Sequence, residues 1–229
     1  MKDKVSIVEN WLKGWCLSRE VSFPVQYKSG FRVIVGDEKQ KERFVFPVLN
    51  EDFFQLAHSI NEPWIYLKVS TAPEEFIEKI PERWVLQPQG YMMTCFHLMH
   101  FREISLAKGY QLDFSEYNTT FVVRIVAENG EQASIGRVSL IDNLAVYDRI
   151  VTEKDHQRKG LATFLLKELE KIALSKGFSN NLLVATEEGK LLYETLGWKV
   201  YCLHTSIVIP SQSQVLSKNS NLDLNYNYK

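Results

Sequence analysis

The chain has 229 residues, of which 45% are hydrophobic and 24% charged; this is the composition of an ordinary globular protein and leaves room for one or two domains. Its 27 lysines and arginines against 28 aspartates and glutamates give a net charge of -1, so no overall field draws the protein to nucleic acid or to anionic lipid. The three cysteines, Cys16, Cys95 and Cys202, lie far apart in sequence, which argues against a disulfide framework and a zinc cluster.

We expect no targeting segment at the start of the chain. Residues 1–15 mix charges among their apolar positions and so lack the continuous apolar core of a signal peptide. No apolar run approaches the ~18 residues that span a bilayer. The expected location is the cytoplasm, with neither membrane nor nucleic acid as a partner.

Helical and strand patterns alternate along the first half of the chain. Apolar residues at helical spacing predict a helix over 5–17, and Asn50 is placed to cap a second helix at its N-terminus. The remaining pattern predicts strands over 31–36, 43–48 and 64–69, a helix over 50–60, a short helix over 73–80, and extended segments between 84 and 101.

The second half begins with a hairpin, because Asn129-Gly130 separates two strand patterns. Gly177 and Gly197 are expected to end the two helices that follow. The predicted elements are strands over 121–127, 133–141 and 144–152, a helix over 161–176, a strand over 182–186, a helix over 187–197, and one or two strands over 198–209.

The segment QRKGLA, residues 157–162, joins the strand over 144–152 to the long helix that follows. A strand that turns directly into a helix brings several unpaired backbone N–H groups to one point, where the helix dipole also favours negative charge. Gly160 lets the backbone approach a ligand closely, Ala162 stays small, and Arg158 and Lys159 add positive charge. The sequence therefore predicts a cradle for the phosphates of a cofactor.

A second motif, LLYETLGW, lies over residues 191–198. With both motifs at this separation, the sequence over about 100–210 resembles the GNAT superfamily of acyl-CoA-dependent N-acyltransferases. The Walker loop and the dinucleotide-binding fingerprint are both absent. The resemblance implies an α/β (α+β) fold with a mixed central sheet flanked by helices, and acetyl-CoA as co-substrate without a metal.

The resemblance also assigns cofactor-binding residues. The strand before the turn would pair with the pantetheine arm of coenzyme A through Ile150, Val151 and Thr152, and the N–H of Thr152 or its neighbour would polarise the thioester carbonyl. His156 stands where the family often has an aromatic residue or Arg, which puts little in doubt. Glu187 or Glu188 stands where the family often has an Asn early in the last helix, which weakens claims about contacts between that helix and the coenzyme. The pyrophosphate would be held by Gln157, Arg158, Lys159, Gly160, Leu161 and Ala162.

Two side chains are candidates for the acid and base chemistry. Tyr193 occupies the family's position for the general acid that protonates the departing thiolate; the alternative is a tyrosine packed in the core. Asp148 is the first candidate base, because it shares a strand face with Ile150 and Thr152 if no bulge intervenes, and Glu153 is the second. We expect the histidines to be structural and no metal site to be present.

The domain organisation is expected to be a smaller α/β domain over 1–105, an acyltransferase domain over 106–210 and a loosely held tail over 211–229. Two interpretations of the first domain remain open. It is either a degenerate second copy of the GNAT order or an extension similar to that of glycine N-acyltransferase-like proteins. In either case we expect it to wall one side of the acceptor cleft. Arg19 is either an anchor for a substrate carboxylate or a surface residue.

The expected function is transfer of an acetyl group from acetyl-CoA to an amine of a small-molecule or amino-acid-like acceptor, by direct nucleophilic attack. One rival is a non-catalytic acyl-CoA sensor, in which the first half carries the output. Another is an acyltransferase with a hydroxyl acceptor. The sequence leaves the acceptor, the acyl chain length and the oligomeric state open.

Overall fold

The structure is a computed structural model that describes residues 4–211. The predicted tail over 211–229 therefore lies, apart from its first residue, outside the described residues. The helices are α1 (Lys4–Arg19), α2 (Glu51–Ser59), α3 (Leu161–Ser175) and α4 (Glu187–Thr195), with the short 3₁₀ helices η1 (Pro73–Glu75), η2 (Ile77–Lys79) and η3 (Lys154–His156). The strands are β1 (Val25–Tyr27), β2 (Gly30–Asp37), β3 (Gln40–Phe46), β4 (Ile65–Val69), β5 (Val85–Leu86), β6 (Gly90–Cys95), β7 (Tyr110–Tyr117), β8 (Thr120–Ala127), β9 (Gln132–Ile141), β10 (Leu144–Thr152), β11 (Asn181–Ala185) and β12 (Lys199–Val208).

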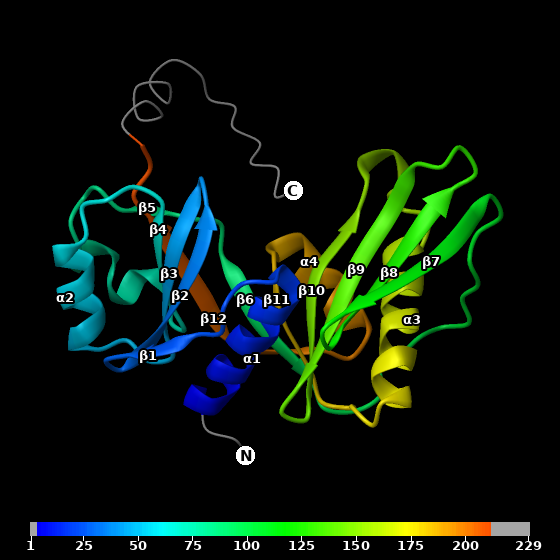
Figure 1. Cartoon of the computed structure of the whole chain (residues 1–229), viewed down its shortest axis with the longest axis horizontal. Helices are drawn as coiled ribbons and strands as arrows, with labels where there is room; N and C mark the ends of the chain where they lie inside the picture. Colours follow the sequence, from blue (N-terminus) through cyan, green and yellow to red (C-terminus); the bar gives the residue numbers. More distant parts are fainter. Residues whose placement is uncertain (1–3, 212–229) are drawn as a thin grey trace.

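These strands form one twelve-stranded mixed sheet, which runs through both halves of the molecule (Figure 1). The order is β1-β2-β3-β4-β12-β6-β11-β10-β9-β8-β7, and β5 adds to β12. Strands that are consecutive in the chain are therefore neighbours at the two ends of the sheet, but not in its middle. The mixed sheet flanked by helices confirms the predicted fold class.

Strands are exchanged between the two halves at the centre of the sheet. β6 comes from the first half but lies between β11 and β12, pairing antiparallel with both. β12 comes from the end of the chain, and its residues 205–208 pair with β4 of the first half. Each half consequently depends on a strand supplied by the other.

The two halves repeat the same succession of elements. In the first, β2 and β3 are antiparallel, α2 follows, and β4 returns parallel to β3. In the second, β9 and β10 are antiparallel, α3 follows, and β11 returns parallel to β10. This succession favours the interpretation as a second copy, and the boundaries at 105 and 106 stay a prediction.

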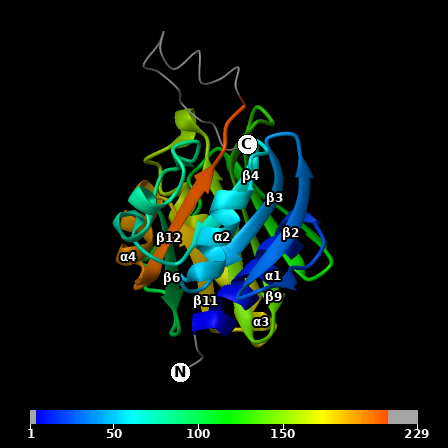
Figure 2. The same cartoon turned by 90° about the vertical axis from the view of Figure 1, so that its left-hand side faces the viewer.

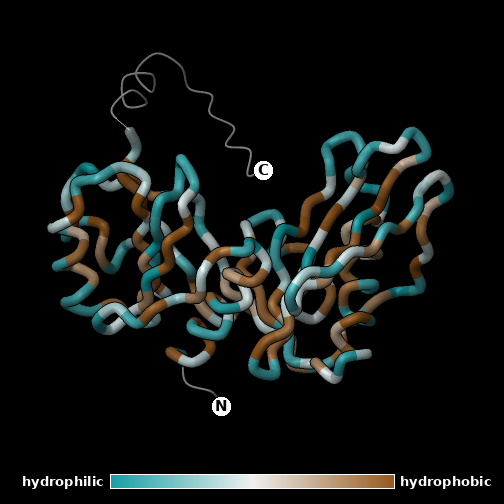
Figure 3. Tube along the Cα trace, viewed as in Figure 1, coloured by the Kyte–Doolittle hydropathy of each residue, from teal (hydrophilic) through white to brown (hydrophobic). Residues whose placement is uncertain are grey.

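The helices cover the sheet on different faces. Apolar residues of α3 pack on β8, β9 and β10, whereas α1 packs its tryptophans and leucines on the other face, against strands of both halves. Figure 1 shows α1 between the two halves, and the hydropathy colours of Figure 3 show apolar segments running along the strands beneath the helices. A third core lies under α2 in the first half, the side that Figure 2 turns toward the viewer.

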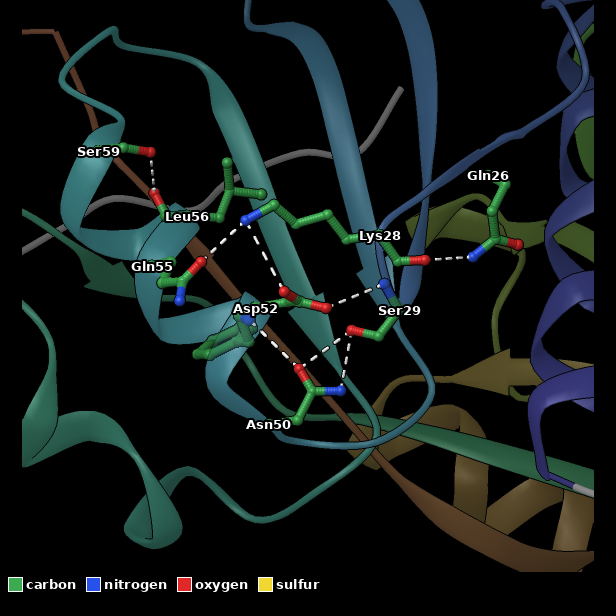
Figure 4. A network of polar contacts seen from close by, with 9 residues as sticks. Gln26, Lys28, Ser29, Asn50, Asp52, Gln55, Leu56 and Ser59 are labelled. Carbon is green, nitrogen blue, oxygen red and sulfur yellow. Dashed lines mark hydrogen bonds and ion pairs between the residues drawn. The ribbon is translucent and has the colours of Figure 1, made fainter.

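Helix α2 begins as expected from Asn50. The Asn50 side chain accepts a hydrogen bond from the N–H of Phe53, 3.4 Å away, and from the Ser29 hydroxyl at 3.1 Å. Asp52 accepts a bond from the N–H of Ser29 at 3.1 Å, so the turn between β1 and β2 is tied to the start of the helix (Figure 4). The cap therefore both starts α2 and anchors a neighbouring turn.

The expected segments differ from the structure in three places. The segment over 73–80 forms the two 3₁₀ helices η1 and η2 rather than one α-helix. β1 and β7 have no counterparts among the expected elements, whereas the single strand β12 agrees with the one or two strands expected over 198–209. Among residues 4–211, no helix is long and apolar enough to cross a membrane.

Candidate active site

The chain turns sharply between β10 and α3. Gln157 ends η3 with its backbone N–H donating to the Lys154 carbonyl oxygen, 3.3 Å away. Arg158 and Gly160 then adopt left-handed conformations, with φ of 62° and 77°. Such alternation turns successive N–H groups toward one side of the backbone and creates an anion-binding concavity.

The backbone N–H groups of residues 158–163 are unpaired within the part of the chain that the structure describes. The first helical bond is made by Phe164, which donates to the Gly160 carbonyl oxygen at 3.0 Å. Unpaired amides at the start of a 15-residue helix are where phosphate groups bind in proteins, because the helix dipole adds to the hydrogen bonds. The structure therefore forms a turn with free amides where the sequence predicts one, and phosphate binding by residues 157–162 stays a prediction.

Gly160 is required at the centre of this turn. Its φ of 77° is strained for any residue with a side chain, and a Cβ there would lie 3.3 Å from the Ile104 side chain. Leu161 is buried in the core under α3, and Ala162 is half-buried in the first helical turn. Packing of Leu161 consequently fixes the end of the turn, while residues 157–160 are exposed.

The charged side chains of the turn are partly held by neighbours. The Lys159 ammonium donates to the Asp155 carbonyl oxygen at 3.0 Å and to the Tyr110 hydroxyl at 3.2 Å, and that hydroxyl also bonds His156 Nδ1 at 2.9 Å. The Gln157 side chain donates to the Thr152 carbonyl oxygen at 3.3 Å. Sequence analysis missed Tyr110, because it comes from β7 and no nearby motif points to it.

Strands β10 and β11 separate soon after they meet. They are paired at only two positions, Ala145 with Asn181 and Val146 with Leu182. Beyond these positions, no strand within residues 4–211 pairs with the edge of β10 that faces β11 (Figure 1). This leaves an open strand edge that leads to the turn at Gln157.

A β-bulge reorients β10 along this edge. Arg149 adopts a φ of 52°, and the register with β9 shifts between Asp148 and Val151. The N–H of Glu153 donates to Ala133 on β9, and because alternate residues of a strand point to opposite edges, the N–H groups of Ile150 and Thr152 face away from β9. The open edge therefore presents these two amides.

The bulge also overturns the expectation that Asp148 shares a face with Ile150. The Ile150 side chain reaches the α3 face, since a Cβ at Gly136 would lie 2.5 Å from its Cδ1. The Asp148 side chain bonds to Ser18 and Arg19 of α1 on the opposite face. The extra residue in the bulge reverses the alternation that the prediction assumed.

Asp148 is held as an ionised carboxylate. The Arg19 guanidinium binds it with Nε at 3.0 Å and a terminal nitrogen at 3.2 Å, and Ser18 also donates to it. Burial alone would raise the pKa of Asp148, but Arg19 and Ser18 outweigh it and hold the pKa below its usual range. A carboxylate so paired is a weak base, and the role of Asp148 as general base stays a prediction, as does that of the exposed Glu153.

Tyr193 lies in the core beneath the diverging strands. Its ring packs on Trp198, with centroids 5.7 Å apart, and its side chain is buried. Burial raises the pKa of Tyr193, and the Asp148 carboxylate raises it further. Within residues 4–211 no hydrogen bond engages its hydroxyl, so Tyr193 is a buried, protonated phenol whose donor is free.

The other residues singled out in the sequence have local partners. Glu187 accepts a hydrogen bond from the Tyr91 hydroxyl and pairs with Lys190 at 3.4 Å. The rings of His97 and His100 stack with centroids 5.2 Å apart. In the described part of the chain, no group of three or more histidine, cysteine, aspartate or glutamate side chains is placed to hold a metal ion.

Comparison with known protein families gives a match in the second half of the chain. Residues 118–200 match the acetyltransferase (GNAT) domain family. None of the curated proteins matches the sequence significantly.

Solved structures share the fold at low sequence identity. A GCN5-related N-acetyltransferase from Kribbella flavida superposes with a TM-score of 0.65 at 12% identity, covering 94% of this chain and 98% of that one. A GCN5-related N-acetyltransferase-like protein from Streptococcus suis 89/1591 gives 0.56 at 14% identity, covering 82% and 88%. A GCN5-related N-acetyltransferase from Sphaerobacter thermophilus gives 0.54 at 8% identity, covering 80% and 78%.

The turn with its free amides, the diverging strand pair and the bulge lie within or beside the matched residues. The similarity of fold extends beyond them, because the Kribbella structure covers nearly the whole chain. Residues 118–200 therefore match a GNAT acetyltransferase domain, and the fold that the chain shares with a solved GCN5-related N-acetyltransferase extends over nearly its whole length.

Proposed function

We propose that the protein transfers an acetyl group from acetyl-CoA to the amine of a small-molecule or amino-acid-like acceptor, by direct attack of the amine on the thioester. The observation that carries the proposal is the row of unpaired backbone amides over residues 158–163 at the start of α3. Together with the open edge of β10, these amides offer hydrogen bonds to an extended donor that carries phosphate groups.

Residues 157–162 would hold the pyrophosphate of the donor, and the open edge of β10 would hold its pantetheine arm. The N–H groups of Ile150 and Thr152 face this edge and are able to bond the amide groups of the arm and the thioester carbonyl. A preorganised donor to the developing oxyanion typically supplies about 3 kcal/mol of transition-state stabilisation. The donor supplies an activated acyl group; the protein supplies alignment and hydrogen bonds.

Tyr193 is the proposed general acid. Its raised pKa keeps it protonated at neutral pH, so that it donates a proton or a hydrogen bond to the departing thiolate. The charge of the Asp148 carboxylate raises the pKa of Tyr193 further. Asp148 is the proposed base that removes the amine proton. Its ion pair with Arg19 makes it a weak base.

Donor binding is tested by thermal unfolding with acetyl-CoA, CoA and longer acyl-CoAs. A ligand at a hundredfold its Kd stabilises the folded state by about 2.7 kcal/mol. We expect this stabilisation in the wild type and its loss in Gly160→Glu, which places a carboxylate and a side chain in the cradle. Gly177→Glu is the matched control, because Gly177 has a φ of 85° at the other end of α3, with nothing within 4 Å.

Turnover is tested with Tyr193→Phe. Loss of the hydroxyl is expected to lower kcat by about a hundredfold or more while the Kd of acetyl-CoA stays unchanged. Tyr147→Phe is the control, because Tyr147 is also buried and packs on the same Trp198, with centroids 5.5 Å apart. A wild type that binds acetyl-CoA but transfers acetyl to no amine or alcohol would support the sensor instead, and paired amines and alcohols identify the attacking group.

A further inference from the structure

Positive side chains from both halves of the molecule converge on the face of the sheet that α1 covers. They come from the end of α1 and from four strands that are distant in sequence. Their charges act on one another, since Arg19 lowers the pKa of Arg43, of Lys68 and of Arg149. We call this set the cationic cluster: Arg19 of α1, Arg43 of β3, Lys68 of β4, Arg137 of β9 and Arg149 of β10.

The end of α1 holds the cluster together. The Arg43 guanidinium lies 3.4 Å from the centroid of the Trp15 ring, and the Arg19 guanidinium lies 4.7 Å from the same centroid. On the side of the first half, the Lys68 ammonium donates to the Ser206 hydroxyl at 2.6 Å. Trp15 therefore separates two guanidinium groups at the junction of the halves.

The second half completes the cluster through β9 and β10. Arg137 lies directly opposite Asp148 in the register of these strands. Arg149 is the bulged residue next to Asp148, and the charge of Arg137 acts on it. The cluster thus reaches the site of acetyl transfer proposed above, where Asp148 also acts on Tyr193.

Negative charge is scarce around these cations. Asp148 is bound by Arg19, and in the described part of the chain Arg43, Lys68, Arg137 and Arg149 form no ion pair. Several buried nitrogens also lack a hydrogen-bond acceptor among residues 4–211. They are Nε of Arg43, Nε of Arg137 and both ring nitrogens of His204.

Burial makes this imbalance costly. Arg43 is 5% exposed, and its burial together with the charge of Arg19 lowers its pKa to about 9. Burial and the charges of Arg43 and Arg19 lower the pKa of Lys68 well below its usual value. Buried cations are stable in proteins when an anion or hydrogen-bond acceptors compensate them. The cluster is therefore incomplete without an anionic ligand.

A cavity lies beside the cluster at the end of β11. It has a volume of about 140 Å³, and Lys68, His204 and Ser206 line it together with Thr186, which follows β11. His204 is 2% exposed and contacts Trp11 of α1 at 4.8 Å between centroids. The cavity and the cluster share Lys68 and lie on the α1 side of the sheet. The cradle for the donor pyrophosphate starts α3, which covers the other face.

We propose that the cationic cluster binds a carboxylate of the acceptor, so that the enzyme acetylates amines that carry an acidic group, with amino acids as the substrate class. This inference rests on the acyl transfer proposed above and specifies its acceptor. A carboxylate accepts bidentate hydrogen bonds from guanidinium groups, and two free Nε donors are buried in this cluster. The amine of such an acceptor would face the thioester from the side opposite α3.

Carboxylate binding is measured first, without any acyl transfer. Succinate and glutarate are titrated into the protein at constant ionic strength, with sodium chloride as the reference, and the melting temperature is recorded. We expect the dicarboxylates to raise the melting temperature of the wild type and to raise that of Arg43→Gln and Arg137→Gln less. The rise in Arg43→Lys should lie between those of the wild type and Arg43→Gln. Arg32→Gln is the matched control, because Arg32 is paired with Glu42 at 2.7 Å and is not a member of the cluster.

The same titration is repeated with saturating CoA. A rise that persists supports a carboxylate site separate from the donor site. A rise that disappears with CoA, no rise in the wild type, or equal rises in all variants would overturn the proposal.

Acceptor selectivity is measured second, with each amino acid beside its amide and its decarboxylated amine. A hydrogen bond to a charged group corresponds to a roughly tenfold or larger difference in kcat/KM. We therefore expect the wild type to prefer each amino acid over its amide and its decarboxylated amine by that factor, and Arg43→Gln to lose the preference. Transfer to neutral and acidic amines at equal rates would remove this inference and leave the acyltransferase function standing. Carboxylate binding without transfer to any amine would overturn both the acceptor assignment and the proposed function.

Discussion

At Asp148, burial and charge act in opposite directions. The side chain is 14% exposed, yet the bidentate bond from Arg19 and the bond from Ser18 hold it ionised. It is also the carboxylate whose charge acts on both Arg43 and Arg149. A single aspartate therefore offsets part of the charge of the cationic cluster and connects α1 to β10, the strand of the proposed transfer site.

Replacing Asp148 with Asn should destabilise the protein in a pH-dependent way. Removing one partner of a largely buried ion pair leaves its cation uncompensated, so we expect a loss of about 2–3 kcal/mol in unfolding free energy at pH 7. The folded-state pKa of Asp148 lies below the unfolded value of about 4, so this contribution is present above pH 4. It is lost as the pH falls through the folded-state pKa.

The measurement is urea unfolding of the wild type and Asp148→Asn at several pH values between 7 and 2. The difference between the two proteins should shrink as the pH falls below 4. Asp113→Asn serves as the control, because Asp113 is 53% exposed and lies 3.6 Å from Arg124, so its ion pair should contribute little. A difference that is independent of pH would show that Asp148 does not stabilise the fold through its charge.

Helix α1 is the element that joins the halves, and its close approach to the sheet depends on Gly14. A Cβ at Gly14 would lie 2.5 Å from Val146 Cγ2, on β10 just before the strands diverge. Around this contact α1 buries Trp11 and Trp15 against strands of both halves. The position of Ser18 and Arg19 at Asp148 consequently depends on how deeply the helix packs.

Gly14→Ala tests this dependence. Alanine favours an isolated helix by about 1 kcal/mol over glycine, whereas forcing a methyl group into a packed core costs about 1–3 kcal/mol. We expect the packing cost to prevail, lowering both the unfolding free energy and kcat, since α1 would move away from Asp148. Adding Val146→Ala should recover part of both losses; a stabilised Gly14→Ala would show that the contact is not tight.

For the whole molecule, the exchange of β6 and β12 couples the two halves. β6 cannot leave its place between β11 and β12 without breaking the second half, and β12 cannot leave without exposing β4 of the first. The cationic cluster is assembled from both halves across this junction. A full acceptor site consequently requires both halves to be folded.

We therefore expect the full chain to unfold in one cooperative thermal transition. Differential scanning calorimetry should give a calorimetric enthalpy equal to the van't Hoff enthalpy. Far-ultraviolet circular dichroism and tryptophan fluorescence should report the same midpoint. Two resolved transitions, or a first half that melts separately, would contradict the coupling and restore the view of two independent domains.

The sequence alone determined most local elements and the turn proposed to hold the donor. The helices, the Asn50 cap and the hairpin at Asn129-Gly130 follow from patterns over neighbouring residues, which is where periodicity and turn chemistry act. The cradle over 157–162 was predictable for the same reason, because its amides are contiguous in the chain. Tyr193 was placed by a motif, and its burial agrees with either role considered for it.

The tertiary structure decided what depends on contacts between distant residues. The bulge at Arg149 sends Asp148 to the α1 face, where Arg19 binds it, and no pattern in the sequence indicates this contact. The cationic cluster draws on five elements, and no sequence spacing connects them. Charge interactions depend on distance and burial, which are set when the strands of the two halves exchange and α1 packs across them.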